Sequence, residues 1–179
     1  MAELAELTAL PRGATFYRTD MHIHSYGASH DVRDKGMTAE AIVETALAQG
    51  LGVIALTVHN EISNVDAAVK AAHGIGLLVV PGVELSTPQG HLLAYLPTLE
   101  TLQRFYGRLD IVDRGGPNSR CQNSVLDCLK QLHGLGGFGI LAHVDADRGF
   151  ETENPGASPH KVDVICHAAL LGIELKTVS

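Results

Sequence analysis

Strand-like and helix-like segments alternate along most of this sequence, and this alternation limits the possible folds. The continuous apolar, β-branched run "GVIALTV" (52–58) is typical of a strand that is buried on both faces, and "FGILAHV" (138–144) predicts another strand. The segment 38–50 has helical spacing, with Thr38 placed to cap its first turn and Gly50 placed to end it. Because strands that alternate with helices form βαβ units, the order predicts an α/β fold around a parallel sheet.

The remaining expected strands and helices also alternate, and they belong to a single domain. A chain of 179 residues with 45% hydrophobic residues can bury a substantial core, and neither a repeat nor an internal domain boundary is evident. We therefore expect an N-terminal extension at 1–15 and one domain at 16–179. Further strands are expected at 16–24, 76–86, 90–97 and 172–176, helices at 64–74, 99–110, 124–137 and 160–172, and an irregular linker at 113–120.

Ligand-type side chains fall where the expected strands end. His22 and His24 end the first strand, and side chains two residues apart in a strand point to the same face. His59, Glu84 and His143 follow or end three later strands. The carboxyl ends of parallel strands converge on one rim, so these side chains should lie together. Imidazole and carboxylate groups are common ligands of transition metals, and the pattern therefore predicts a metal site at this rim.

Charge and cysteine content restrict the setting of the chain. The formal net charge of −7 argues against a surface built for duplex nucleic acid, and no apolar run is long enough for a membrane span. Glu3 and Glu6 lie where a secretory signal would be positively charged. Three cysteines cannot all pair with one another (Cys121, Cys128 and Cys166). We therefore expect a cytoplasmic protein with reduced thiols.

The motifs "DMHIHS" (20–25), "GVIALTVHN" (52–60), "VVPGVELST" (79–87) and "GILAHVDAD" (139–147), in this order, resemble the successive motifs of the PHP (polymerase and histidinol phosphatase) family. The resemblance covers residues 16–176 and implies a distorted, TIM-barrel-like (βα)7 barrel. It also implies two or three divalent metals per complete site, commonly zinc, manganese or iron. The segments "HLLAYL" and "ALLGIEL" further resemble the N-terminal PHP domains of longer proteins that carry an ATPase region.

The resemblance also implies a set of metal ligands. Glu84 matches the carboxylate that bridges two metals, and His30 matches a ligand of the loop after the first strand, with the neighbouring Asp31 as the alternative. His91 matches a histidine of the segment after the glutamate. The full expected metal set is His22, His24, His30, His59, Glu84, His91 and His143.

The sequence departs from the family pattern at several positions. Val58 stands where an aspartate usually precedes the histidine of the second motif, Ala94 stands where a second histidine can occur, and Val144 replaces a usual proline. The family's closing Asp-x-His motif is absent from the sequence, so we expect a barrel that is incomplete at its C-terminal end. Open edge strands would then either pair with another copy or leave the metal site short of protein ligands.

The activity implied by the resemblance is hydrolysis of a phosphomonoester, a nucleotide or a nucleic-acid phosphoester by a metal-bound hydroxide. Glu84 is one expected catalytic residue, and Arg148 is the other because it follows the His143 strand at the rim. The expected partners are a phosphorylated small molecule or nucleotide, another copy of the chain, and a downstream ATPase region. The alternatives are a non-catalytic metal- or nucleotide-binding regulatory domain of a larger protein, and a metal-dependent hydrolase of C–N bonds.

Overall fold

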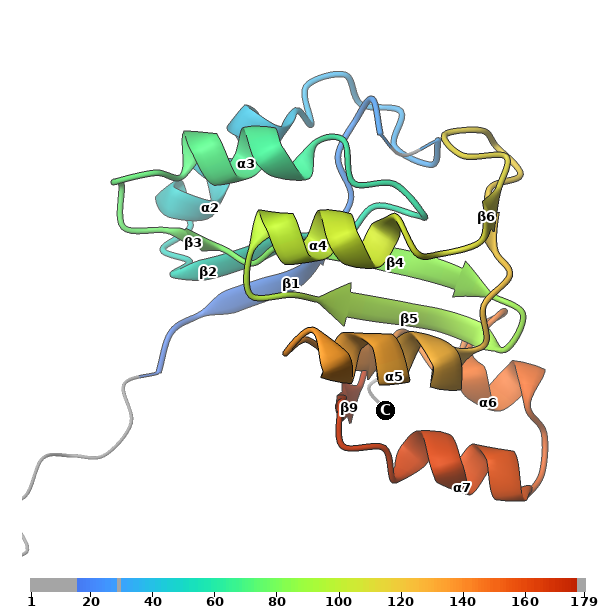
Figure 1. Cartoon of the computed structure of the whole chain (residues 1–179). Coiled ribbons are helices and arrows are strands. Elements are labelled where there is room, and N and C mark those ends of the chain that lie inside the picture. Colours follow the sequence, from blue (N-terminus) through green and yellow to red (C-terminus); the bar gives the residue numbers. More distant parts are fainter. Residues whose placement is uncertain (1–15, 29, 177–179) are drawn as a thin grey trace, which may run out of the picture.

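The computed structural model of the protein describes residues 16–28 and 30–176, so the expected N-terminal extension at 1–15 lies outside the described residues. The described chain is a curved sheet with helices packed on it (Figure 1). Its strands are β1 (Thr19–Ile23), β2 (Val53–Leu56), β3 (Leu78–Val79), β4 (Gly82–Thr87), β5 (Gly90–Tyr95), β6 (Ile111–Val112), β7 (Arg120–Cys121), β8 (Phe138–Leu141) and β9 (Leu170–Ile173). Its helices are α2 (Ala39–Ala48), α3 (Val65–Ala71), α4 (Leu99–Tyr106), α5 (Val125–Gly134), α6 (Phe150–Glu153) and α7 (Pro159–Ile165).

Two sheets form one continuous curved surface. The first has the order β1-β2-β3 and is parallel, and the second has the order β4-β5-β8-β9. The expected strand at 76–86 is divided at Val80 and Pro81 into β3 and β4, since proline cannot donate a ladder hydrogen bond. A parallel bridge between His59 and Glu84 joins the end of β2 to β4. In the described chain β1 and β9 are the two ends of this surface, which does not close into a barrel.

The expectation of an entirely parallel sheet is wrong for β5, which is antiparallel to both β4 and β8. A tight turn joins β4 to β5, whereas a parallel connection would need a longer crossover. The Thr87 hydroxyl donates to the Gly90 carbonyl at 2.6 Å, and Gly90 has a φ of 111°. A Cβ atom at Gly90 would lie 2.7 Å from the backbone nitrogen of Phe150, so both the conformation and the packing favour glycine.

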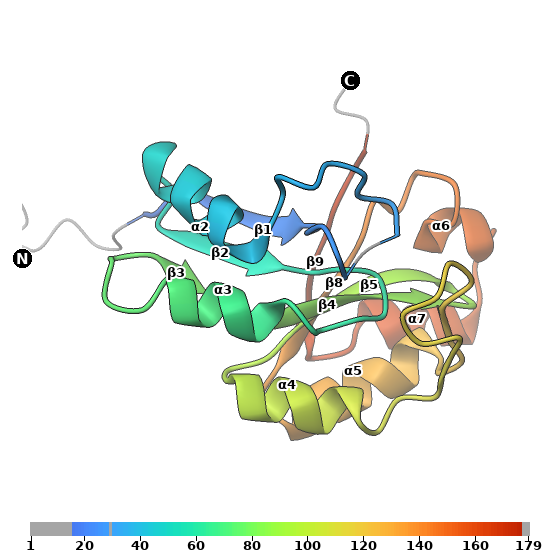
Figure 2. The same cartoon turned by 90° about the horizontal axis from the view of Figure 1, so that it is seen from above.

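The core lies on both faces of the strands, with alternate residues on each face. Leu92 packs with the main core, which includes buried side chains of α4 and α5, whereas Leu93 and Tyr95 pack in a smaller cluster with Ala55 and Ala142. Figures 1 and 2 show α4 and α5 on the same side of β4 and β5. The helices therefore cover one face of these strands. The rim at the strand ends stays free for polar side chains.

The ends of the helices expected at 38–50, 64–74, 99–110 and 124–137 agree with the structure to within a few residues, but the helix expected at 160–172 is wrong beyond Ile165, where α7 ends. The Ala41 amide donates to the Thr38 hydroxyl at 3.2 Å, which confirms the predicted cap of α2. The last strand differs more, because β9 begins at Leu170 and ends before Glu174. The described residues contain no helix that combines the length and the apolar character needed to cross a bilayer.

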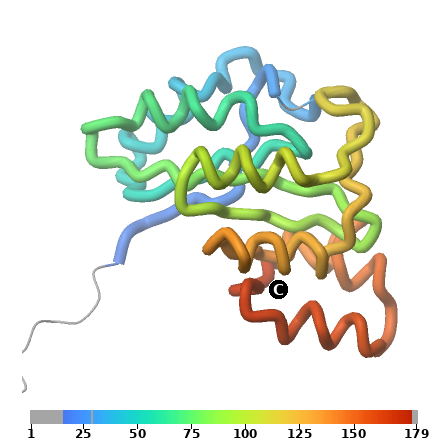
Figure 3. The backbone as a smooth tube through the Cα atoms, viewed as in Figure 1, coloured from blue at the N-terminus to red at the C-terminus, as the bar shows by residue number. Residues whose placement is uncertain are grey.

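The expected linker at 113–120 is instead the loop of a small hairpin. Its two ends pair antiparallel as β6 and β7, with Ile111 opposite Cys121 and Val112 opposite Arg120. In the sequence this hairpin follows α4 and precedes α5. In space, β7 contacts β4, and Figure 3 shows the hairpin as the yellow part of the tube. The hairpin therefore brings Arg120 toward the rim where the strands end.

Candidate metal centre

Glu84 is the centre of a cluster of five histidines. It lies in β4 and is 0% exposed, and both of its carboxylate oxygens are within 3.3 Å of imidazole nitrogens. The contacts to Oε2 are His24 Nε2 at 2.8 Å, His22 Nε2 at 3.1 Å and His59 Nδ1 at 3.3 Å, and those to Oε1 are His91 Nδ1 at 3.0 Å and His143 Nε2 at 3.1 Å.

The first half of the sheet positions three of these histidines. His22 lies in β1 and His24 directly follows it, with ring centroids 5.2 Å apart, so both rings share one face as their spacing predicts. His59 follows β2 at the bridge to β4, where the Asn60 amide donates to the Glu84 carbonyl at 2.7 Å. This bridge fixes the end of β2 against the strand that carries the central carboxylate.

The second half of the sheet adds the other two. His91 lies opposite Ser86 in the β4–β5 pair, and because β5 is antiparallel its beginning lies at the same rim as the end of β4. His143 follows β8 and has a φ of 29°, a value that is uncommon for a residue other than glycine. Nδ1 of His143 is buried and has no hydrogen-bond partner among the described residues. This nitrogen is therefore a buried donor or acceptor that no described residue satisfies.

The donor set fits divalent transition metals. Among the residues that the structure describes, three groups have ligand atoms within 4.8 Å of one another, so each could hold an ion, and Glu84 belongs to two of them. Imidazole nitrogens suit zinc, manganese and iron, and a carboxylate can bridge two cations. The groups are His22, His24 and Glu84; His24, Asp31 and His59; and His59, Glu84 and His91.

The side chains of the cluster place one buried anion among imidazoles. Burial alone would raise the pKa of Glu84, but hydrogen bonds from His143, His22, His24 and His91 hold it far below the usual range. Burial opposes the charged form of His22, yet the hydrogen bonds and charges of Glu84 and Glu174 raise its pKa to about 9. Burial and the charges of His24 and His91 lower the pKa of His59 to about 4. Glu84 is therefore ionised at neutral pH, as a metal ligand must be.

Asp31 and His30, the two alternatives in the first loop, occupy different positions. Asp31 Oδ2 lies 2.7 Å from His24 Nδ1, and although partial burial raises the pKa of Asp31, this hydrogen bond and the charge of His24 lower it overall. His30 is exposed, and its ring stacks at 6.2 Å from the ring of His59. The structure thus brings Asp31 into a metal-capable group and leaves His30 at the edge of the cluster.

Glu174 contacts this cluster, although the sequence interpretation did not include it. Its Oε2 lies 3.0 Å from His22 Nδ1 and accepts a hydrogen bond from the His143 backbone amide at 3.1 Å. The sequence predicts Glu174 inside a strand at 172–176, but in the structure this residue directly follows the end of β9. The rule that selected the other strand-end residues would have found Glu174 if that strand had been predicted correctly.

Arg148, the expected cationic residue, lines a cavity of about 160 Å³ beside the cluster. The same cavity is lined by Arg120, which belongs to the expected linker at 113–120 and is not among the expected catalytic residues. Arg148 has a φ of 62°, so two residues of the β8–α6 loop, His143 and Arg148, adopt the left-handed region. The other residues that line this cavity are His30, His59, Ser86 and His91.

Comparison with known proteins gives one curated relative at the sequence level. No protein-family model matches the chain. A 5'-3' exoribonuclease from Haemophilus influenzae is 37% identical over 68 residues, which is 38% of this chain and only 23% of that protein. The match therefore covers much less than two thirds of the relative.

Several solved structures share the fold. One, assigned as a metal-dependent phosphoesterase from Bifidobacterium adolescentis, has a TM-score of 0.60 and 17% identity over 89% of this chain and 77% of its own. A two-domain protein from Bacteroides vulgatus with a predicted PHP-like metal-dependent phosphoesterase has a TM-score of 0.59 and 20% identity over 88% of this chain and 43% of its own. Endonuclease Q from Pyrococcus furiosus has a TM-score of 0.58 and 16% identity over 79% of this chain and 40% of its own. The described residues therefore have a PHP-like, TIM-barrel-related α/β fold, as the sequence motifs predict.

Proposed function

We propose that this chain is a metal-dependent phosphoesterase that hydrolyses phosphate esters at the Glu84 cluster. The observation that carries the proposal is the fully buried, ionised Glu84 with imidazole nitrogens at 2.8–3.3 Å on both oxygens. His22, His24, Asp31, His59, His91 and His143 would hold divalent cations with Glu84 between them. When bound, such cations supply positive charge for phosphoryl oxygens and lower the pKa of water.

The protein's own residues complete this assignment. Glu84 keeps the imidazoles converged on one point, and Glu174 orients the ring of His22 through Nδ1. Arg148 lines the cavity next to His59 and His91, where its guanidinium can donate hydrogen bonds to phosphoryl oxygens. A nucleic acid or nucleotide is the favoured substrate class, because the curated relative is named an exoribonuclease and one structural neighbour an endonuclease.

A second candidate is a regulatory domain that binds a metal or a nucleotide without turnover. Val58, next to His59, is only 1% exposed and belongs to the apolar core, so this position supplies no carboxylate to the neighbouring histidine. The proposed metal is zinc, manganese or iron, and the proposed covalent partner is a downstream ATPase region.

The test is a substrate screen with manganese, zinc or iron added to chelator-treated protein. We expect hydrolysis of p-nitrophenyl phosphate, nucleotides or short oligonucleotides, no hydrolysis of amide substrates, and loss of activity in Glu84→Gln. Glu44→Gln is the matched control, because Glu44 is exposed on α2. Metal binding with no turnover of any phosphate ester would favour the regulatory domain, and turnover that survives Glu84→Gln would contradict the assignment of the site.

A further inference from the structure

Arg120 is a second arginine at the rim, and it comes from the β6–β7 hairpin rather than from the end of a long strand. Its Nη1 donates to the Ser119 carbonyl at 2.7 Å, and the side chain is half-buried. A guanidinium has five N–H donors, so most of its hydrogen-bonding capacity is left for a ligand. No ion pair holds Arg120 or Arg148 within the described part of the chain.

Asn60 ties this hairpin to the metal centre. It is 0% exposed, and its Nδ2 donates to the same Ser119 carbonyl at 3.1 Å while its Oδ1 accepts from the Ser86 amide at 2.9 Å. Its backbone amide is bonded to the Glu84 carbonyl, and its φ is 49°. Asn60 directly follows His59, and its buried contact with Ser119 holds the backbone next to Arg120. Less conformational entropy is therefore lost when the Arg120 side chain binds a ligand.

Two cavities share both arginines. The inner one, of about 160 Å³, borders His59 and His91, and the outer one, of about 270 Å³, continues from His91 along Thr87 and Gln122. The outer cavity has two arginines and one carboxylate, Glu153, among its lining residues. In a chain with a formal charge of −7, this is a locally cationic surface next to the metal-capable groups. The outer cavity extends away from the metal-capable groups. An anion bound in it would therefore lie beside a phosphate bound at the metal centre.

We propose that Arg120 is a specificity-determining residue that binds a second phosphate of the substrate in the outer cavity. The inference rests on the proposed function, because it assumes that the first phosphate occupies the metal centre. The substrate class that fits is a molecule with two phosphates close together, such as adjacent nucleotides of a chain or a bisphosphorylated sugar. A substrate with a single phosphate leaves Arg120 without its ligand.

Two pairs of probes distinguish a nucleotide chain from a bisphosphorylated sugar as the source of the second phosphate. The first pair is a 5'-phosphorylated dinucleotide and the same molecule with an uncharged methylphosphonate linkage, in which a methyl group replaces the charged non-bridging oxygen of the second phosphate. The second pair is glucose 1,6-bisphosphate and glucose 6-phosphate. Binding to the metal-loaded protein is measured by calorimetry, with chromatography of the recovered sample to detect turnover. If a probe is turned over, the ratio of KM values replaces the ratio of Kd values.

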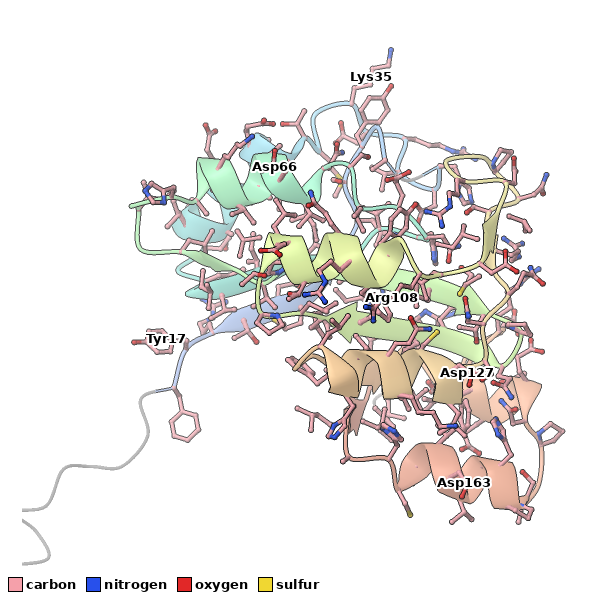
Figure 4. The ribbon with its side chains drawn as sticks, in the orientation of Figure 1. Tyr17, Lys35, Asp66, Arg108, Asp127 and Asp163 are labelled. Carbon is pink, nitrogen blue, oxygen red and sulfur yellow. The ribbon has the colours of Figure 1, made fainter. Side chains whose placement is uncertain are left out.

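We expect the wild-type protein to prefer the doubly charged member of at least one pair by roughly tenfold, the effect of one charge-assisted hydrogen bond. Arg120→Gln should lose this preference, and Arg120→Lys should retain part of it, because lysine keeps the charge but not the planar fork. The control is Arg108→Gln, since Arg108 is exposed near the end of α4 and lines neither cavity (Figure 4).

Two results would overturn the inference: no preference in the wild-type protein for either pair, or a preference that persists in Arg120→Gln. Thermal melting and metal content show whether each variant is folded and loaded. If Arg120→Gln does not fold, Arg120→Lys decides the question by the same ratios: a preference below that of the wild-type protein supports the inference, and an undiminished preference overturns it. Hydrolysis of p-nitrophenyl phosphate reports on the metal centre alone, so failure of the second-phosphate subsite is distinguishable from failure of the proposed function.

Discussion

Oε2 of Glu174 lies 3.0 Å from Nδ1 of His22, while the other nitrogen of that ring, Nε2, faces Glu84 at 3.1 Å. Glu174 follows β9 and His22 lies in β1, so this contact joins the two ends of the open sheet. A carboxylate on one ring nitrogen sets the tautomer and the orientation of the other nitrogen, which is the one available to a metal. Glu174 therefore acts on the candidate metal centre through His22.

Glu174→Gln should weaken metal binding by about 10–100-fold, the usual effect of removing a carboxylate that supports a ligating histidine. Zinc or manganese titration of chelator-treated protein measures the affinity. Glu44→Gln, an exposed change of the same type on α2, should bind metal like the wild-type protein. Unchanged affinity in Glu174→Gln would show that the contact with His22 is only structural.

The purified protein should contain at least one tightly bound transition metal per chain, because the described part of the chain has three overlapping groups of His, Asp and Glu side chains that can hold an ion. Elemental analysis after purification without chelator measures this content. A content below roughly 0.2 metal per chain that does not rise after soaking in manganese or zinc would contradict the site, since assembled, deprotonated ligands bind such ions. His22→Ala should reduce the content, whereas His73→Ala, at an exposed histidine after α3, should not.

Replacement of Glu84 should abolish binding of more than one metal. In Glu84→Ala and Glu84→Gln the histidines keep their strands but lose the carboxylate that lies between them. We expect phosphatase activity to fall by at least about 100-fold, because the charge that positions the cations is gone. Metal content and activity are measured together with circular dichroism, and full activity in a folded variant would exclude a bridging role for Glu84.

Metal binding should strengthen as the pH rises from about 6.5 to about 9. The pKa of His22 is raised to about 9 in the metal-free protein and that of His24 is also raised, so a metal must displace protons from these rings. Each displaced proton changes the apparent affinity by about tenfold per pH unit. The stability of the metal-free protein changes in the opposite direction. Protonated His22 stabilises the fold fully below its unfolded pKa of 6.5, and this stabilisation is lost as the pH rises through about 9. The difference in melting temperature between loaded and metal-free protein should therefore grow with pH.

Asn60→Ala should lower the free energy of unfolding by about 2–4 kcal/mol, because it removes two hydrogen bonds and leaves the buried Ser86 amide unpaired, although the Ser119 carbonyl keeps its hydrogen bond from Arg120. The substitution also places alanine at a φ of 49°. Urea unfolding followed by circular dichroism gives this value. Asn118→Ala, at an exposed position of the same hairpin, should change stability by less than about 0.5 kcal/mol. Equal stability of the two variants would mean that Asn60 does not hold the hairpin.

The sequence by itself determined the fold class and the centre of the site. Runs such as 52–58 and 138–144 specify buried strands through local apolar patterning, and the residues that end them are set by the chain itself. Glu84, His22, His24, His59 and His143 could be selected from these strand ends, because the ends of neighbouring strands meet at one rim. The structure brings all five together.

Only the tertiary structure decided the remaining partners. Whether Asp31 or His30 approaches His24 depends on the path of a loop, and the approach of Glu174 to His22 depends on where β9 ends and on the curvature of the whole sheet. Arg120 reaches the rim through a hairpin that antiparallel pairing and Asn60 hold in place. These contacts join residues that are 7 to 152 positions apart, and their distances are set by strand pairing and left-handed loop residues rather than by local propensity.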